Sequence, residues 1–221
     1  MSPLNIPEKL FILTIDDHNS RIDVSIRTTL RYGLAGAVLA ELALANRIEL
    51  HDGRLALMDS GPAGNEFLEE FLAQIKSEKK PHKLSRWVDS FGRKQIVDQI
   101  AERLAEQRVI TLENKKYLWI IPYDAYPQLD ASAKYWLKQH LRGIVLAGEK
   151  SEPADIALLS LLRSCGFIRL LFTWDERRYA NKKVKALVNG EIFGKAVAEL
   201  LSEIDEAAAA AAVAAASAAI G

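Results

Sequence analysis

The chain has 221 residues, of which 49% are hydrophobic and 26% are charged, a composition typical of a globular protein and not of a disordered one. Its 29 basic and 29 acidic residues give a formal net charge of zero, so no global charge favours nucleic acid or another polyanion as a partner. The one cysteine, Cys165, excludes an intrachain disulfide and indicates a reducing compartment, and its apolar neighbours predict a buried thiol.

The sequence shows neither a signal peptide nor a membrane-spanning segment. The first apolar run is short and has no basic segment before it. Residues 30–50 approach the length of about 20 apolar residues that a spanning helix needs, but Glu41 interrupts them and Arg31 and Arg47 bracket the centre. We therefore expect a cytoplasmic protein that at most lies on the cytosolic face of a membrane.

The most apolar helix is predicted between residues 23 and 45, where Asp23 or Ser25 can cap its start. Projected at 100° per residue, its apolar side chains occupy every side, which is typical of a buried central helix. Glu41 falls inside this apolar surface, and a buried carboxylate must be paired, hydrogen-bonded or protonated. We expect Glu41 to form an internal ion pair, because a catalytic role would need a second acid or a metal ligand.

Shorter amphipathic helices and small hairpins are predicted around the central helix. Asp52-Gly53 predicts one hairpin turn, residues 108–121 predict a second hairpin with its turn at 113–116, and residues 167–174 resemble a strand. Residues 10–15 are apolar but too few for a lone helix. The expected helices lie at residues 67–75, 84–91, 96–104, 131–142, 154–163, 181–188 and 191–204, with an alanine-rich helical extension at 207–221.

A short pattern is repeated along the chain. Residues 40–50 and 101–112 both read as a helix, a basic residue and a short strand, and residues 158–172 form a looser third copy with Gly166 at the break. Winged-helix modules share this pattern, so a nucleic-acid-binding protein is the alternative hypothesis. The helices before the predicted strands are apolar, which disfavours their use as recognition helices.

The order of these segments resembles a known family. The strongest segment is G-L-x-G-x-x-L-x-E-L-A-L-x-x-R-I at residues 33–48, followed by a helix with Trp87, then "IAERLAEQRVITLENKKYLWI" and "DIALLSLLRSCGFIRLLF". Over residues 10–204 the chain is similar to the Golgi phosphoprotein 3 family. The resemblance implies one mostly α-helical domain over residues 1–206, with a buried central helix, surrounding amphipathic helices and small β-hairpins on one face.

The resemblance also implies a function. Eukaryotic members of the family bind phosphatidylinositol 4-phosphate on the cytosolic face of the Golgi and retain glycosyltransferases by binding their short basic tails. We therefore expect a non-enzymatic peripheral membrane adaptor without a cofactor. Its implied partners are an anionic membrane lipid, cytosolic tails of membrane proteins and a second copy of the chain, with nucleic acid less favoured.

The family's lipid-headgroup residues are largely replaced in this sequence. The family uses a tryptophan, an arginine in G-L-R-G, and two arginines three residues apart. Ile26, Ala35 and Val97 stand at three of these positions, and Lys94 alone keeps a basic side chain.

Other basic residues near these positions can contribute instead. Arg27 and Arg31 precede Ala35 by two turns and one turn of the predicted helix, and Arg93 adjoins Lys94. Guanidinium groups bind phosphate through charge-assisted hydrogen bonds. The candidate headgroup-binding residues are therefore Arg27, Arg31, Arg93 and Lys94.

A second candidate membrane element is the apolar hairpin that follows Lys115 and Lys116. Apolar residues beside lysines suit a membrane interface, and a dimer contact or a buried strand is the alternative. The candidate residues are Leu118, Trp119, Ile120 and Ile121.

The remaining polar motifs predict no catalytic or metal-binding residue. Asp16, Asp17 and His18 have the side chains of metal ligands, but adjacent residues rarely converge on one ion, so a polar turn is expected. The densest basic cluster, at residues 177–185, could contact anionic lipid or nucleic acid, and a solvated helix face is the alternative.

Overall fold

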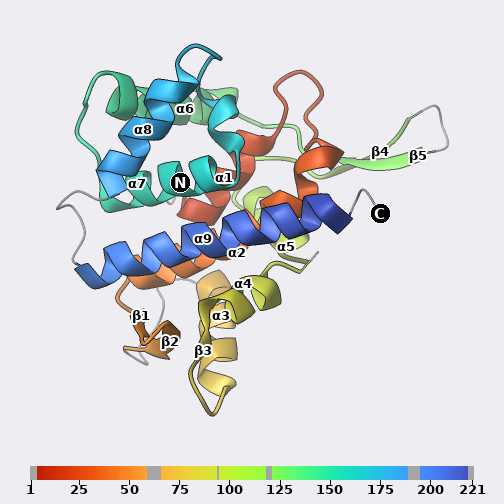
Figure 1. Ribbon diagram of the computed structural model, residues 1–221. Coiled ribbons are helices and arrows are strands. Elements are labelled where there is room, and N and C mark those ends of the chain that lie inside the picture. The colour runs from red at the N-terminus through yellow and green to blue at the C-terminus, as the bar shows by residue number, and fades with distance from the viewer. Residues whose placement is uncertain (1–3, 59–65, 94, 118–120, 189–194, 219–221) are drawn as a thin grey trace.

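The computed structural model describes residues 4–58, 66–93, 95–117, 121–188 and 195–218 (Figure 1). The helices are α1 (Ile6–Thr14), α2 (Arg27–Leu44), α3 (Glu66–Ser77), α4 (Leu84–Phe91), α5 (Gln95–Glu106), α6 (Ala131–Leu146), α7 (Pro153–Ser164), α8 (Arg177–Val188) and α9 (Lys195–Ala218), with 3-10 turns η1 (Val24–Ile26) and η2 (Phe167–Leu170). Strands β1 (Ile48–His51), β2 (Arg54–Leu57) and β3 (His82–Lys83) form one antiparallel sheet, and β4 (Glu113–Tyr117) and β5 (Ile121–Ala125) form another. The predicted mostly α-helical class is confirmed.

Helix α2 is the buried centre of the molecule. Leu34, Val38 and Leu42 lie along one side of it and Leu39 on another, and all four are fully buried. Helices α1, α4, α5, α7 and α9 pack against α2, and α9 runs beside it along most of its length (Figure 1). Each fully buried leucine or valine stabilises the fold by about 1.5–3 kcal/mol, so burying α2 contributes strongly to stability.

Small residues let the neighbouring helices approach α2 closely. A Cβ atom on Gly36 would lie 2.9 Å from side-chain carbons of both Leu161 in α7 and Ile204 in α9. A Cβ atom on Gly33 would lie 2.9 Å from the sulfur of Cys165. The predicted burial of the Cys165 thiol is confirmed, since 6% of this residue is exposed.

Helix α1 was missed by the prediction, which considered only residues 10–15. The helix starts earlier, at Ile6, with a reciprocal capping box. The Asn5 side chain accepts a hydrogen bond from the Glu8 backbone N–H, and the Glu8 carboxylate accepts one from the Asn5 N–H, both at 2.9 Å. Pro7 in the first turn also favours the helix start. The sequence Asn-Ile-Pro-Glu carries this signal.

Glu8 also joins α1 to α5 through a buried ion pair. Its carboxylate is 1% exposed and accepts hydrogen bonds from Arg103 Nε at 2.6 Å and Gln107 Nε2 at 2.8 Å. Together with the Asn5 N–H, these donors satisfy the buried charge. The ion pair therefore fixes the position of α5 relative to the N-terminus.

Glu41 has a different partner from the ion pair that we expected. Its carboxylate is half-buried and accepts a 2.8 Å hydrogen bond from the backbone N–H of Ile6, in the first turn of α1. No basic side chain in the described ranges lies within ion-pair distance of it. Burial raises the pKa of the Glu41 carboxyl, while this hydrogen bond and the charge of Lys9 act in the opposite direction.

The repeated segments share one way of ending a helix. Asn46 after α2, Arg108 after α5 and Gly166 after α7 all have positive φ, at 54°, 59° and 69°. Asn46 and Arg108 each belong to a complete Schellman motif. In this motif the backbone N–H groups of the positive-φ residue and of the residue after it donate to carbonyl oxygens in the last turn of the helix. The repeat in the sequence therefore corresponds to similar helix ends. After the third copy the chain forms η2, so the strand predicted at residues 167–174 was wrong.

The two hairpins differ in how well the sequence predicted them. The β1–β2 turn at Asp52-Gly53 is confirmed, and both residues have positive φ, as a two-residue hairpin turn requires. In the other hairpin, residues 113–116 form strand β4 and not the turn, and Pro122 pairs with Lys116 inside β5. Proline is tolerated there because each strand of a two-stranded sheet is an edge. The two sheets lie at separate edges of the helical body (Figure 1).

Replacing Arg103 tests the buried ion pair. In Arg103→Met, the Glu8 carboxylate stays in the core without its cation, so we expect the free energy of unfolding to fall by about 3 kcal/mol. The matched control is Arg86→Met, which removes an exposed ion pair with Glu78 and should cost less than about 1 kcal/mol. Equal losses in urea unfolding of the two variants would contradict the role of the Glu8 pair.

Replacing Glu41 tests the raised pKa. Because the folded-state pKa lies above the ordinary value of 4.5, the ionised carboxylate lowers stability, and this effect grows as pH rises through the folded-state pKa. Glu41→Gln keeps an acceptor for the Ile6 N–H and carries no charge. We expect this variant to be more stable than the wild type near neutral pH, with the difference vanishing below pH 4.5. A less stable variant at neutral pH, measured by urea unfolding, would show that the ionised form is the favourable one.

Candidate functional site

An open cavity of about 400 Å³ lies where the start of α2 meets α5 and the base of the β4–β5 hairpin. Its wall combines basic, acidic and apolar side chains from segments far apart in the sequence. The lining residues are Ile22, Val24, Arg27, Thr28, Arg31, Val97, Asp98, Asp124 and Tyr126. We call this cavity the α2–α5 pocket.

Two arginines stand one helical turn apart on the α2 side of this pocket. Arg27 and Arg31 are both half-buried, and the Nε of Arg31 is buried without a hydrogen-bond partner. None of the ion pairs within the described ranges includes either arginine. Both guanidinium groups therefore have donors available for a ligand, in the planar geometry that suits phosphate.

The opposite side of the α2–α5 pocket is acidic. Asp98 comes from α5 and Asp124 from β5, and burial together with the charge of Asp124 raises the pKa of Asp98, while Arg27 opposes this shift. Tyr126 lies beside them and is 5% exposed. Burial and the charge of Asp124 raise the pKa of its hydroxyl to about 12, so Tyr126 is a neutral hydrogen-bonding group.

The structure places the predicted headgroup residues in different positions. Arg27 and Arg31 line the α2–α5 pocket together with Val97, while Arg93 is exposed and does not line it. Lys94 lies outside the described residues. The sequence analysis did not identify Asp98 and Asp124 as site residues. In the sequence they are visible only as a polar residue beside Val97 and a polar residue after the apolar segment that ends at Ile121.

Two positions that carry family headgroup side chains are part of the core in this chain. Ile26 is 6% exposed and Ala35 is fully buried, and neither lines the α2–α5 pocket. The pocket of this chain is therefore built from Arg27 and Arg31, on the first turns of α2, instead of from those positions.

The β4–β5 hairpin projects from the helical body next to this pocket (Figure 1). Asp124 and Tyr126, at its base, belong to the pocket wall. The Arg21 guanidinium stacks on the Tyr123 ring and holds the hairpin base against the loop before α2. Of the predicted membrane residues, Leu118, Trp119 and Ile120 lie outside the described residues, and Ile121 begins β5.

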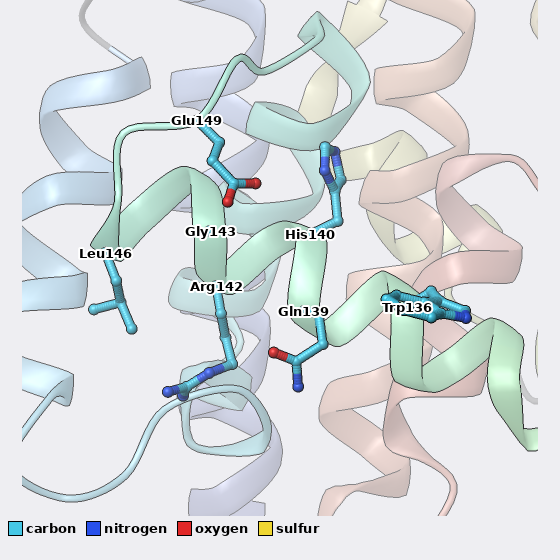
Figure 2. A pocket seen from close by; sticks show the side chains of 7 residues that line it. All are labelled: Trp136, Gln139, His140, Arg142, Gly143, Leu146 and Glu149. Atoms are coloured by element: carbon cyan, nitrogen blue, oxygen red, sulfur yellow. The ribbon is translucent and has the colours of Figure 1, made fainter.

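A second cavity, of about 610 Å³, runs along the outer side of α6 (Figure 2). Six of its seven lining residues come from that helix, and Glu149 lies over Gly143. Two of its charged or titratable side chains, Arg142 and His140, already have internal partners. Arg142 forms a two-pronged ion pair with Glu176, at 2.8 Å for each contact, and His140 lies 3.0 Å from Asp155. This groove therefore offers fewer free polar groups than the α2–α5 pocket.

A third cavity is an acidic groove of about 260 Å³ between α3 and α5. Four exposed glutamates line it, together with Phe67 and Gln99, and the one basic residue in its wall, Arg103, is neutralised by Glu8. The glutamates are Glu66, Glu70, Glu102 and Glu106. We call this feature the acidic groove. Its charge suits a basic ligand.

The described residues hold no group of three or more His, Cys, Asp or Glu side chains that could bind a metal ion. The predicted polar turn is confirmed, since Asp16 accepts hydrogen bonds from the backbone N–H groups of His18 and Asn19. Asp17 forms ion pairs with Lys134 and Lys138 of α6. Among the described helices, none combines the length and the apolar character needed to cross a membrane.

The fold and its cavities define a mostly helical protein with a mixed-charge pocket at the base of a projecting hairpin. The sequence model of the family described as Golgi phosphoprotein 3 (GPP34) matches residues 6–204, so the chain belongs to this family, as predicted. The chain is also similar to vacuolar protein sorting-associated protein 74 of Eremothecium gossypii, with 20% identity over 166 residues. This alignment covers 65% of the chain and 49% of the relative, so the chain spans about half the length of that protein.

Proposed function

We propose that this protein is a non-enzymatic peripheral membrane adaptor that binds an anionic lipid, phosphatidylinositol 4-phosphate or another, through the α2–α5 pocket. The observation that carries the proposal is the pair of half-buried arginines, Arg27 and Arg31, which share one open cavity and have no internal ion pair within the described ranges. A phosphate between them would accept charge-assisted hydrogen bonds, each contributing about 1.5–3 kcal/mol. Both arginines can therefore add to affinity without breaking the fold.

The position of the pocket supports a membrane role. The β4–β5 hairpin projects beside it, and Val24 at its rim is 76% exposed. A headgroup in the pocket would bring its glycerol and acyl chains close to these elements, where apolar contacts add to binding. In this proposal Leu118, Trp119, Ile120 and Ile121 enter the membrane surface, and family membership supports a Golgi-type cytosolic membrane as the location.

The adaptor role needs a second binding surface, and the acidic groove can provide it. We propose that basic cytosolic tails of membrane proteins bind there, because four exposed glutamates face the groove and Phe67 forms part of its apolar wall. The similar protein of Eremothecium gossypii is named as associated with vacuolar protein sorting, which agrees with a role in selecting membrane proteins. The groove and the pocket are both built on α5, so one protein could engage both partners together.

The alternative of nucleic-acid binding has less support. In a winged-helix module, the helix beside the hairpin must expose side chains to the major groove. Here α2 precedes the β1–β2 hairpin, and its residues Leu34, Val38, Leu39 and Leu42 are fully buried. A DNA shift measured beside the lipid assay would overturn the lipid proposal if DNA bound and vesicles did not.

The lipid proposal is tested with the double variant Arg27→Ala/Arg31→Ala. We expect the wild type to sediment with phosphatidylcholine vesicles that contain an anionic lipid, and the variant to bind about a hundredfold more weakly, because two charge-assisted contacts are lost. The control, Arg178→Ala/Lys182→Ala, removes the same charge at the same spacing from an exposed face of α8. Equal losses in the two variants would mean that general charge attraction, and not the pocket, causes binding.

The acidic groove is tested with Glu70→Gln/Glu102→Gln. We expect the affinity for a short arginine- and lysine-rich peptide, measured by fluorescence anisotropy, to fall about tenfold at low salt, because exposed ion pairs contribute up to about 1 kcal/mol each. Glu199→Gln/Glu206→Gln on α9 makes the same charge change at exposed positions and should bind as the wild type does. If both double variants lose affinity equally, the peptide does not bind in the groove.

A further inference from the structure

Helix α8 carries a row of exposed basic side chains. Arg178, Lys182 and Lys185 follow one another at intervals of four and three residues, so they lie on one side of the helix, and all three are exposed. None of the ion pairs within the described ranges includes them, and the helix itself contains no acidic residue. Like charges one turn apart on a helix repel each other. An anionic surface laid against this row would therefore relieve the repulsion.

Two exposed aromatic side chains accompany the basic row. Trp174, in the turn directly before α8, is 84% exposed, and Tyr179, in the first turn of the helix, is 53% exposed. Tryptophan, tyrosine and arginine are the side chains that contribute most to protein–protein contacts. The same surface thus combines positive charge with aromatic groups that would lose water on contact with a protein partner. We call Trp174, Arg178, Tyr179, Lys182 and Lys185 the α8 face.

The acidic groove matches the α8 face in charge and in spacing. Each wall of the groove, α3 and α5, carries two of its exposed glutamates four residues apart, which is about 6 Å along a helix. Arg178 and Lys182 have the same separation on α8. A helix that lies along the groove can therefore bring the basic residues of successive turns close to carboxylates of both walls.

Within one molecule these two surfaces cannot meet. Helix α8 packs against α6, α7, η2 and α9, and it lies on the opposite side of α2 and α9 from α3 (Figure 1). The 29 basic and 29 acidic residues of the chain balance, but the α8 face and the acidic groove are local concentrations of opposite sign that both stay exposed. A second copy of the chain always supplies the complementary surface.

We propose that the protein self-associates head to tail, with the α8 face of one copy bound in the acidic groove of the next. This inference goes beyond the proposed function, because the contact needs neither a lipid nor a cytosolic tail. Each copy contributes a different surface, so every assembly keeps one free α8 face and one free groove and can add further copies. The α8 face and a basic tail compete for the same glutamates, so self-association also limits how many grooves can hold a tail.

The contact is weak and sensitive to salt. One helix face in one groove buries less than the roughly 1,600 Å² of a standard stable interface. Ion pairs between exposed side chains also weaken as the Debye length shortens. We expect a Kd of about 100 µM at low salt and no association in about 1 M salt. At the low micromolar concentrations of the vesicle assay the protein is then monomeric, so Arg178→Ala/Lys182→Ala stays a valid control there.

The test is sedimentation equilibrium of the full chain and two variants at low salt. Arg178→Gln/Lys182→Gln keeps the groove and loses the α8 face, and Glu70→Gln/Glu102→Gln keeps the α8 face and loses the groove. We expect the wild type to form species larger than a dimer as its concentration rises, and each variant alone to associate at least about tenfold more weakly. An equimolar mixture of the two variants should associate as tightly as the wild type but stop at a 1:1 dimer, because only one intact pair of surfaces is present.

The control is Lys79→Gln/Lys80→Gln, which removes two exposed basic residues away from both surfaces and should associate as the wild type does. A wild type that is still monomeric at about 500 µM would overturn the proposal. So would a variant mixture that stays monomeric, or association that persists in Arg178→Gln/Lys182→Gln alone, because the contact would then use other surfaces. None of these measurements contains vesicles or a peptide, so their failure leaves the proposed lipid and tail binding untouched.

Discussion

The structure depends on the need to bury α2 on all its sides. An ordinary surface helix hides one face, but α2 carries buried leucines, alanines and one valine on all its sides, so it must be surrounded by other elements. Gly33 and Gly36 allow that cover to be close, because any larger residue there would overlap side chains of the neighbouring helices. The first turns of α2 carry Arg27 and Arg31 into the α2–α5 pocket. The candidate site thus lies at the start of the central helix, where its cover is incomplete.

Helix α5 is the other element that defines the site, and its place is fixed by a charge inside the protein. Glu8 is buried in α1 and needs donors, and Arg103 and Gln107 supply them. In this arrangement the first turn of α5 contributes Val97 and Asp98 to the α2–α5 pocket, and Glu102 and Glu106, further along the helix, line the acidic groove. In the proposed adaptor role, building both surfaces on one helix would keep the bound lipid and the bound protein tail at a fixed distance and orientation.

The sequence was informative where a feature is local and less so where it depends on distant segments. The periodicity of α2 and the Asp52-Gly53 turn could be predicted, because each is encoded within a few turns of chain. Residues 167–174 were predicted to form a strand because the run is largely apolar, although the buried residues Phe167, Ile168, Leu171 and Phe172 follow the spacing of a helix. The partner of Glu41 and the meeting of Asp98 with Arg27 join segments far apart in sequence, which a single sequence does not record.

In this chain Ile26, Ala35 and Val97 stand where the resemblance implies one tryptophan and two arginines, which changes how the pocket can recognise a ligand. A pocket lined mainly by arginines attracts any strongly anionic group through its net field, and salt weakens that attraction. In the α2–α5 pocket the formal charges of Arg27, Arg31, Asp98 and Asp124 balance, so the electric field of the pocket falls off quickly with distance. Binding there should depend on short-range geometry, whereas the uniformly negative acidic groove can attract a basic tail from further away. In the proposed function the two surfaces therefore differ in mechanism. Recognition in the α2–α5 pocket depends on short-range contacts, and attraction of a basic tail to the acidic groove depends on charge and weakens as salt rises.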